Sequence, residues 1–102
     1  MARVENVYGL LPGDYQGLHQ WQGGRCAICQ RATGRSKRLA VDHNHRLEDL
    51  GRVSVRGLLC STCNQMLGHA RDDVQFFVRA ARYLLEPPAQ KYFLDTQPGQ
   101  GA

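Results

Sequence analysis

Four cysteines in two closely spaced pairs constrain the fold of this chain more than any other feature. The pairs read CAIC and CSTC, and thirty residues separate them: Cys26, Cys29, Cys60 and Cys63. Two such CxxC turns are typical of a tetrathiolate zinc site, because a tight turn lets both sulfurs of a pair face one ion. We therefore expect one structural Zn²⁺ bound by all four thiolates, which leaves no open position for a catalytic water.

The size of the chain agrees with a metal that stabilises the fold. Its 102 residues support one domain with a small core, and small domains often gain stability from a metal or from disulfides. Disulfides are the alternative here, but they need an oxidising compartment, and the N-terminus lacks the apolar core of a signal peptide. No apolar run approaches the roughly 20 residues of a membrane span. We expect a soluble, cytoplasmic protein without a membrane partner.

Positive charge is concentrated in the segment that contains the cysteine pairs. The net charge is +4, and eight of the 13 basic residues but only three of the nine acidic residues lie between Arg25 and Arg56. A local excess of cations is typical of a surface that binds phosphates, and a solvated basic face is the alternative. The candidates for phosphate contacts are Arg35, Lys37, Arg38, Arg46 and Arg56.

The order of the patterns predicts a hairpin followed by helices, which is a small α+β domain. The expected elements are a weak helix over 12–22, a strand over 38–43, a connection over 45–51, a returning strand over 52–59, and a helix that opens at the second CxxC. Ser61 or Thr62 can cap that helix. Tyr15 and Trp21 are expected to pack against the small core, with stacking on bases as the alternative.

A second helix with a clear apolar stripe follows. Asp72 or Asp73 can cap it, apolar residues recur at helical spacing from Val74 to Leu85, and a Pro-Pro pair ends it. We expect one zinc-stabilised domain over residues 1–86, with its core at 24–70. Residues 87–102 are expected to form a loosely packed C-terminal extension.

Candidate catalytic groups gather in the sequence LAVDHNH, residues 39–45. Hydrolysis of a phosphodiester needs a base that is effective near neutral pH, which suits histidine, and a divalent cation, which for Mg²⁺ means oxygen ligands. Asp42 can supply a carboxylate, and Asn64, directly after the last cysteine, can supply an amide oxygen. Asp42 and His43 would point to opposite faces of a regular strand, so both can serve one site only where the strand ends and twists. Asn44 is expected to stabilise a turn.

The combination of CAIC, VDHNH and RGLLCSTCN resembles the His-Me finger (HNH) nucleases, and most closely the phage recombination endonuclease VII type. The resemblance covers about residues 8–80. It implies a ββα-metal (His-Me finger) fold with a four-cysteine structural zinc site and flanking helices. It implies His43 as the general base, with Asp42 and Asn64 as ligands of a catalytic Mg²⁺ or Mn²⁺. His45 either contacts the phosphate or the metal, or makes only a local turn hydrogen bond.

The resemblance also implies a function. The substrate would be double-stranded or branched DNA, cleaved to 5′-phosphate and 3′-hydroxyl ends, and the absence of identifiable base-reading side chains predicts weak sequence specificity. Phage DNA recombination or packaging proteins are the implied partners, in the cytoplasm of an infected bacterial cell. Endonuclease VII proper has a longer C-terminal portion, so we expect nicking or double-strand cleavage in place of junction resolution.

Two other functional classes fit part of the pattern. A zinc-stabilised nucleic-acid-binding module without catalysis explains the cysteines and the basic segment equally well. It has little use for the carboxylate of Asp42, which repels DNA unless a cation intervenes. A protein-interaction module of the RING or LIM sort usually carries ligands for two zinc ions, whereas only one set of cysteines is complete here.

Overall fold

The computed structural model describes residues 9–96 and 98, and its contacts divide the chain into two compact units, Met1–Met66 and Leu67–Ala102. The first unit contains α2 (Asp14–Trp21), β1 (Ala40–His43), η1 (His45–Ser54), β2 (Val55–Leu59) and the start of α3 (Ser61–His69). The second contains the end of α3, α4 (Val74–Leu85) and α5 (Pro88–Asp95). Helices and a small sheet together confirm the predicted α+β class.

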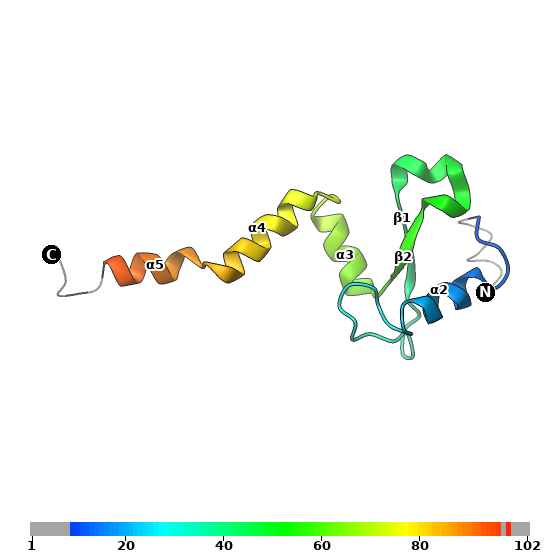
Figure 1. Ribbon diagram of the computed structural model, residues 1–102, viewed down its shortest axis with the longest axis horizontal. Coiled ribbons are helices and arrows are strands. Elements are labelled where there is room, and N and C mark those ends of the chain that lie inside the picture. The colour runs from blue at the N-terminus through cyan, green and yellow to red at the C-terminus, as the bar shows by residue number, and fades with distance from the viewer. Residues whose placement is uncertain (1–8, 97, 99–102) are drawn as a thin grey trace. The chain divides into compact units, whose positions relative to one another are not determined.

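The predicted hairpin is present, and its two antiparallel strands lie side by side in Figure 1. Ala40 pairs with Leu59 and Asp42 with Gly57, but His43 pairs with Val55. The register therefore shifts between Asp42 and His43, and Arg56 is the extra residue. Such a bulge bends a strand and redirects the side chains beside it. The bulge lies between Asp42 and His43, the two residues that can serve one site only if the strand departs from regular geometry there.

The connection between the strands is longer than predicted. The returning strand begins at Val55, whereas the sequence predicted a start at Arg52. Residues 45–54 instead form two 3-10 turns that meet at a kink, where Gly51 has φ 59° and ψ −119°. Positive φ favours glycine, and the alternating pattern around Val53 concealed this break. The Ser54 hydroxyl donates to Gly51 O at 2.6 Å, and Asn44 N donates to Ser54 O at 2.8 Å, which closes the hairpin.

Helix α2 confirms the predicted N-terminal helix and shows which of its residues face inward. Tyr15 is buried, and its hydroxyl donates to Leu39 O at 2.6 Å. The prediction that Trp21 packs in the core is wrong, because its side chain is 88% exposed. Gln22 takes the inward position, since the seventh residue after Tyr15 returns to nearly the same face of a helix.

The amide of Gln22 pairs with the free edge of β2. Its Nε2 donates to Leu58 O at 3.0 Å and to Arg25 O at 2.9 Å, and its Oε1 accepts from Leu58 N at 2.8 Å. Leu58 is fully buried, so these two backbone groups need partners inside the protein. Gly57 leaves room for the amide, because a Cβ there would lie 3.1 Å from Gln22 Oε1.

Few side chains form the core of the first unit. Those buried most completely are Leu58 and Cys26, and the remaining buried apolar residues of this unit are Leu10, Tyr15, Leu39, Val41, Leu59 and Cys63. Helix α3 follows β2 as predicted, but Ser61 is its first residue and does not precede it as a cap. The sulfur of Cys60 accepts a hydrogen bond from Cys63 N at 3.4 Å at that end.

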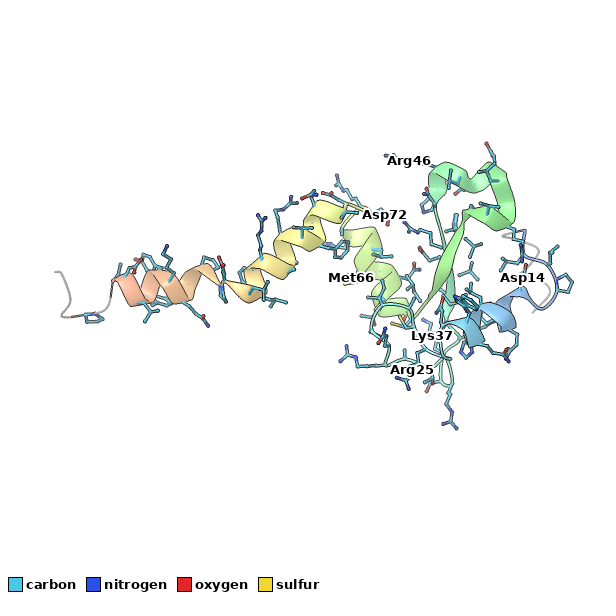
Figure 2. The ribbon with its side chains drawn as sticks, in the orientation of Figure 1. Asp14, Arg25, Lys37, Arg46, Met66 and Asp72 are labelled. Atoms are coloured by element: carbon cyan, nitrogen blue, oxygen red, sulfur yellow. The ribbon has the colours of Figure 1, made fainter. Side chains whose placement is uncertain are left out.

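The second unit consists of helices with exposed apolar side chains. Asp73 caps α4 as predicted, since its Oδ1 accepts from Gln75 N at 3.0 Å, and α4 ends before the Pro-Pro pair. Within the predicted C-terminal extension, residues 88–95 form a helix, α5, that was not predicted. Proline is favoured at the first position of a helix, so a Pro-Pro pair that follows one helix can also begin the next. Figure 2 draws the side chains that surround α4 and α5. In the part of the chain that the structure describes, every helix is too short or too polar to span a membrane.

Replacing Gln22 with alanine should destabilise the first unit by about 1–3 kcal/mol, because Leu58 would keep a buried N–H and C=O without partners. Denaturant unfolding of the purified protein measures this free energy. Gln20→Ala, at an exposed position of the same helix, is the matched control and should change it by less than about 0.5 kcal/mol. Equal stability of the two variants would contradict the role of the Gln22 amide.

Candidate functional site

The four cysteines converge at one point of the first unit. Their sulfurs all lie within 4.8 Å of one another, and Cys29 Sγ and Cys60 Sγ are 3.9 Å apart. None of these four cysteines forms a disulfide, and Cys26 and Cys63 are buried whereas the other two are half-buried. This cluster, predicted from the CxxC spacing, could hold a metal ion, and four sulfur donors suit a soft or borderline cation.

Backbone N–H groups point at the sulfurs of the cluster. Arg31 N donates to Cys29 Sγ at 3.5 Å. Hydrogen bonds from the backbone at Ala32 and Arg31 lower the pKa of Cys29 from 9.0 to about 6, so this residue is a thiolate at neutral pH. Burial raises the pKa of Cys63 to about 12. A bound cation would offset the cost of ionising Cys63, because it stabilises the thiolate directly.

The cysteine cluster is attached to the hairpin on both sides. Ala27, inside the first CxxC, donates from its backbone N to Leu58 O at 3.1 Å. The second CxxC begins directly after β2 and forms the first turn of α3. The cluster therefore holds together the loop before β1, the end of β2 and the start of α3.

Asp42 and Arg56 form a two-pronged ion pair at the bulge. Arg56 Nε donates to Asp42 Oδ2 at 2.6 Å, and Arg56 Nη2 donates to Asp42 Oδ1 at 2.9 Å. The Asp42 side chain is 11% exposed and that of Arg56 is 36% exposed. The predicted metal ligand and one predicted phosphate contact are thus partners in this structure. The bulge explains why Arg56 contacts Asp42, because Arg56 is the extra residue that the bulge adds to β2.

His43 and His45 meet at the carboxylate of Glu48, a residue that the sequence reasoning missed. His43 Nε2 donates to Glu48 Oε1 at 3.1 Å, and His45 Nδ1 donates to the same oxygen at 3.0 Å. The two imidazole rings are 4.5 Å apart. These hydrogen bonds lower the pKa of Glu48, and the one from His45 has the larger effect. The available signal was the turn after β1, since a short helical turn brings residues three apart together.

The two asparagines near these groups have different surroundings. Asn44 caps the first 3-10 turn, because its Oδ1 accepts from Arg46 N at 2.9 Å, which agrees with the turn-stabilising role expected for it. Asn64 lies in the first turn of α3, half-buried, and its backbone N donates to Cys60 O at 2.9 Å. The cysteine cluster thus fixes the backbone that carries Asn64.

The basic candidates fall into separate places. Arg35 and Lys37 line a concavity of about 390 Å³ with Arg31 and with Ser61 at the start of α3. Arg46 is exposed in η1, and Figure 2 shows it at the opposite end of the hairpin from Lys37. Arg38 is engaged within the fold, because its guanidinium lies 4.0 Å from the centre of the Tyr15 ring. A cation on an aromatic face is stabilised there.

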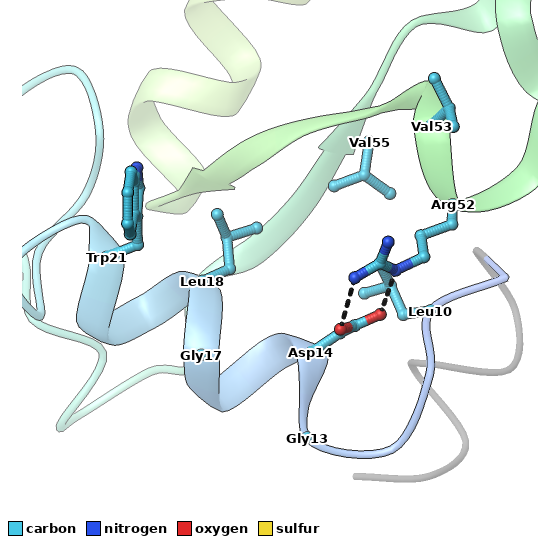
Figure 3. Close-up of a pocket in the computed structure, with 9 residues that line it drawn as sticks. All are labelled: Leu10, Gly13, Asp14, Gly17, Leu18, Trp21, Arg52, Val53 and Val55. Carbon is cyan, nitrogen blue, oxygen red and sulfur yellow. Dashed lines mark hydrogen bonds and ion pairs between the residues drawn. The ribbon is translucent and has the colours of Figure 1, made fainter.

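A second concavity lies between α2 and the end of the hairpin connection (Figure 3). It measures about 460 Å³, and Leu18, Trp21 and Val55 are among its lining residues. Its charged groups are Asp14 and Arg52, which bind each other at 2.6 and 3.0 Å. Hydrogen bonding from Arg52 lowers the pKa of Asp14 to about 2. Asp14 is therefore ionised near neutral pH, and among the described lining residues none is suited to acid–base chemistry.

Comparisons with known proteins match the part of the chain that contains the hairpin and the cysteine cluster. The family model for recombination endonuclease VII matches residues 1–86. The Gene 59 protein of Mycobacterium phage L5 is 51% identical over 89 residues, which are 86% of this chain and 51% of the relative. The Gene 59 protein of Mycobacterium phage D29 is 48% identical over the same shares. The chain spans about half the length of these relatives. The resemblance stated from the motifs is confirmed, and the chain belongs to the recombination endonuclease VII family.

Proposed function

We propose that this chain is a metal-dependent DNA endonuclease with a ββα-metal site of the His-Me finger (HNH) type. It would hydrolyse phosphodiester bonds to 5′-phosphate and 3′-hydroxyl ends. One observation carries the proposal beyond family membership. His43, the Asp42–Arg56 pair and the start of β2 lie together at a bulge in a hairpin that is continuous with the cysteine cluster. Residues 1–86 are the proposed nuclease domain.

His43 is the proposed general base. It ends β1, its side chain is 20% exposed, and its Nε2–H is held by Glu48. An imidazole that donates from Nε2 carries its lone pair on Nδ1, so Nδ1 is the atom that would accept a proton from water.

Asp42 and Asn64 are the proposed ligands of a catalytic Mg²⁺ or Mn²⁺. A carboxylate and an amide oxygen fit the preference of Mg²⁺ for oxygen donors, with water and phosphate completing the shell. When bound, such an ion neutralises charge on the phosphate and the leaving oxygen. Arg56 already orients the Asp42 carboxylate, and its side chain is 36% exposed, so its guanidinium could also contact a phosphate.

The four cysteines are proposed to bind one structural Zn²⁺. Their donor set is all sulfur, all four sulfurs lie within 4.8 Å of one another, and zinc binds four thiolates tetrahedrally. Its role would be to fix the hairpin and α3, and with them the backbone of Asn64.

The DNA surface is proposed to include the concavity formed by Arg31, Arg35 and Lys37 and the exposed side chain of Arg46. These contacts would reach phosphates, so binding should weaken steeply with salt and depend little on base sequence. Protein partners in phage DNA recombination or packaging remain part of the proposal.

A binding module without catalysis is the second candidate, and the Asp42–Arg56 pair favours it. The pair gives the carboxylate a structural partner, so Asp42 does not require a cation to be explained. Cleavage of supercoiled plasmid with and without Mg²⁺ separates the two functions, because a binding module would shift the plasmid in a gel without nicking it.

His43→Ala should lower the rate of Mg²⁺-dependent plasmid nicking by about 10²- to 10⁴-fold, the usual contribution of a general base. His69→Ala is the matched control, since His69 is exposed in the second unit, and it should nick like the wild type. Nicking by His43→Ala at the wild-type rate would refute His43 as the base.

Asp42→Asn should raise the Mg²⁺ concentration needed for half-maximal nicking by at least about tenfold, because the amide keeps a hydrogen-bond acceptor for Arg56 but loses the anionic metal ligand. A Mg²⁺ titration of the nicking rate measures this effect. Asp49→Asn, an exposed carboxylate nearby, controls for net charge. An unchanged Mg²⁺ requirement in Asp42→Asn would remove Asp42 from the metal site.

Elemental analysis should find about one zinc per chain in the purified wild type, and Cys60→Ser should lose it. Loss of a structural zinc removes free energy of folding, so circular dichroism should show the variant unfolded. Chelation should unfold the wild type in the same way, and added Zn²⁺ should restore it. A folded wild-type protein that contains no zinc would contradict this role of the cysteines.

A further inference from the structure

His43, His45 and Glu48 form a second cluster of potential metal ligands, separate from the cysteines. One donor atom from each residue lies within 4.8 Å of the other two. The side chain of His45 is 72% exposed and that of Glu48 is 55% exposed, whereas His43 is 20% exposed. The cluster is therefore anchored on one side by the hairpin and open to solvent on the other.

The donor set selects the kind of ion. Two imidazole nitrogens and one carboxylate oxygen are typical of Zn²⁺ and other late first-row divalent ions, whereas Mg²⁺ prefers oxygen ligands throughout. With metal–ligand distances of about 2.0–2.1 Å, two donors on a tetrahedral zinc lie about 3.3 Å apart. The distances from Glu48 Oε1 to His43 Nε2 and His45 Nδ1 are 3.1 and 3.0 Å. Small movements of the exposed side chains would admit the ion.

The local fold holds the three donors together. His43 is the last residue of β1, and His45 and Glu48 lie in the 3-10 turns that follow. Asn44 fixes this turn twice, because its Oδ1 accepts from Arg46 N and its backbone N donates to Ser54 O. The backbone that presents the ligands is thus braced by hydrogen bonds that do not involve the ligands themselves.

We propose that His43, His45 and Glu48 bind a late first-row divalent ion such as Zn²⁺, and that this ion inhibits the nuclease. The inhibitory part rests on the proposed function. A neutral imidazole that binds a metal through Nε2 carries its proton on Nδ1. Neither nitrogen of His43 then accepts a proton from water, so the base is lost. Three protein ligands also leave a position for water or phosphate.

Binding is tested on protein whose cysteine site is already loaded, with free metal removed. Calorimetric titration with Zn²⁺ should show one further equivalent per chain in the wild type and in the control Asp49→Asn. Glu48→Gln and His45→Ala should each weaken it by at least about tenfold, since even groups that only support metal ligands contribute about 10- to 100-fold. NMR of the zinc-titrated protein should shift the ring resonances of His43 and His45. Absence of the further equivalent, or its persistence in both variants, would overturn the site.

Activity is tested separately on the same proteins. Zn²⁺ added at constant Mg²⁺ should inhibit plasmid nicking by the wild type and by Asp49→Asn over the concentration range in which the further equivalent binds. Inhibition of His45→Ala should require at least about tenfold more Zn²⁺. Equal inhibition of all three would refute the inhibitory role. A protein that binds the further zinc but never nicks DNA would contradict the proposed function and leave the metal site standing.

Discussion

The convergence of four cysteine side chains is the constraint on which the rest of the first unit depends. Leu58 and Cys26 are its most completely buried side chains, so one of the two belongs to the cysteine cluster itself. A core this small contributes little stability, and the cluster joins the loop before β1 to the start of α3. Around Leu58, Ala27 N and the Gln22 amide supply the hydrogen bonds that a third strand would otherwise supply. The hairpin is thus completed by side-chain and loop contacts, one of which comes from Ala27, inside the first cysteine pair.

The irregularity of the hairpin matters as much as its pairing. In a regular strand Asp42 and His43 would serve opposite faces. The bulge adds Arg56 to β2, and Arg56 holds the Asp42 carboxylate with two hydrogen bonds. His43 then stands at the end of β1 with its own carboxylate partner, Glu48. Two neighbouring residues are thereby given different electrostatic surroundings, one beside a cation and one beside an anion, as separate roles in acid–base and metal chemistry would require.

The sequence allowed prediction of features that depend on spacing. The cysteine cluster, the hairpin, α2 and the cap of α4 by Asp73 all follow from local motifs, and the structure confirms them. Features that depend on the three-dimensional partner were missed. Trp21 ends α2 and Gln22 follows it directly, and only the position of β2 decides that the amide turns inward. Nothing in the sequence distinguished Glu48 from the neighbouring Asp49, and only the structure shows that two imidazoles contact its carboxylate. Helix α5 was missed because its two prolines were interpreted only as a stop signal.

The two candidate metal clusters differ in a way that would give one ion opposite effects. Four thiolates close the coordination shell of zinc and bind it tightly, with folding free energy linked to binding. Two imidazoles and one exposed carboxylate are fewer and harder donors, and they form a more open site. Zinc would therefore fill the cysteine cluster first and reach the histidines only when it is in excess. Under these proposals the same ion would stabilise the hairpin at low concentration and occupy His43 at higher concentration, because the first cluster would crosslink the chain and the second contains the proposed general base.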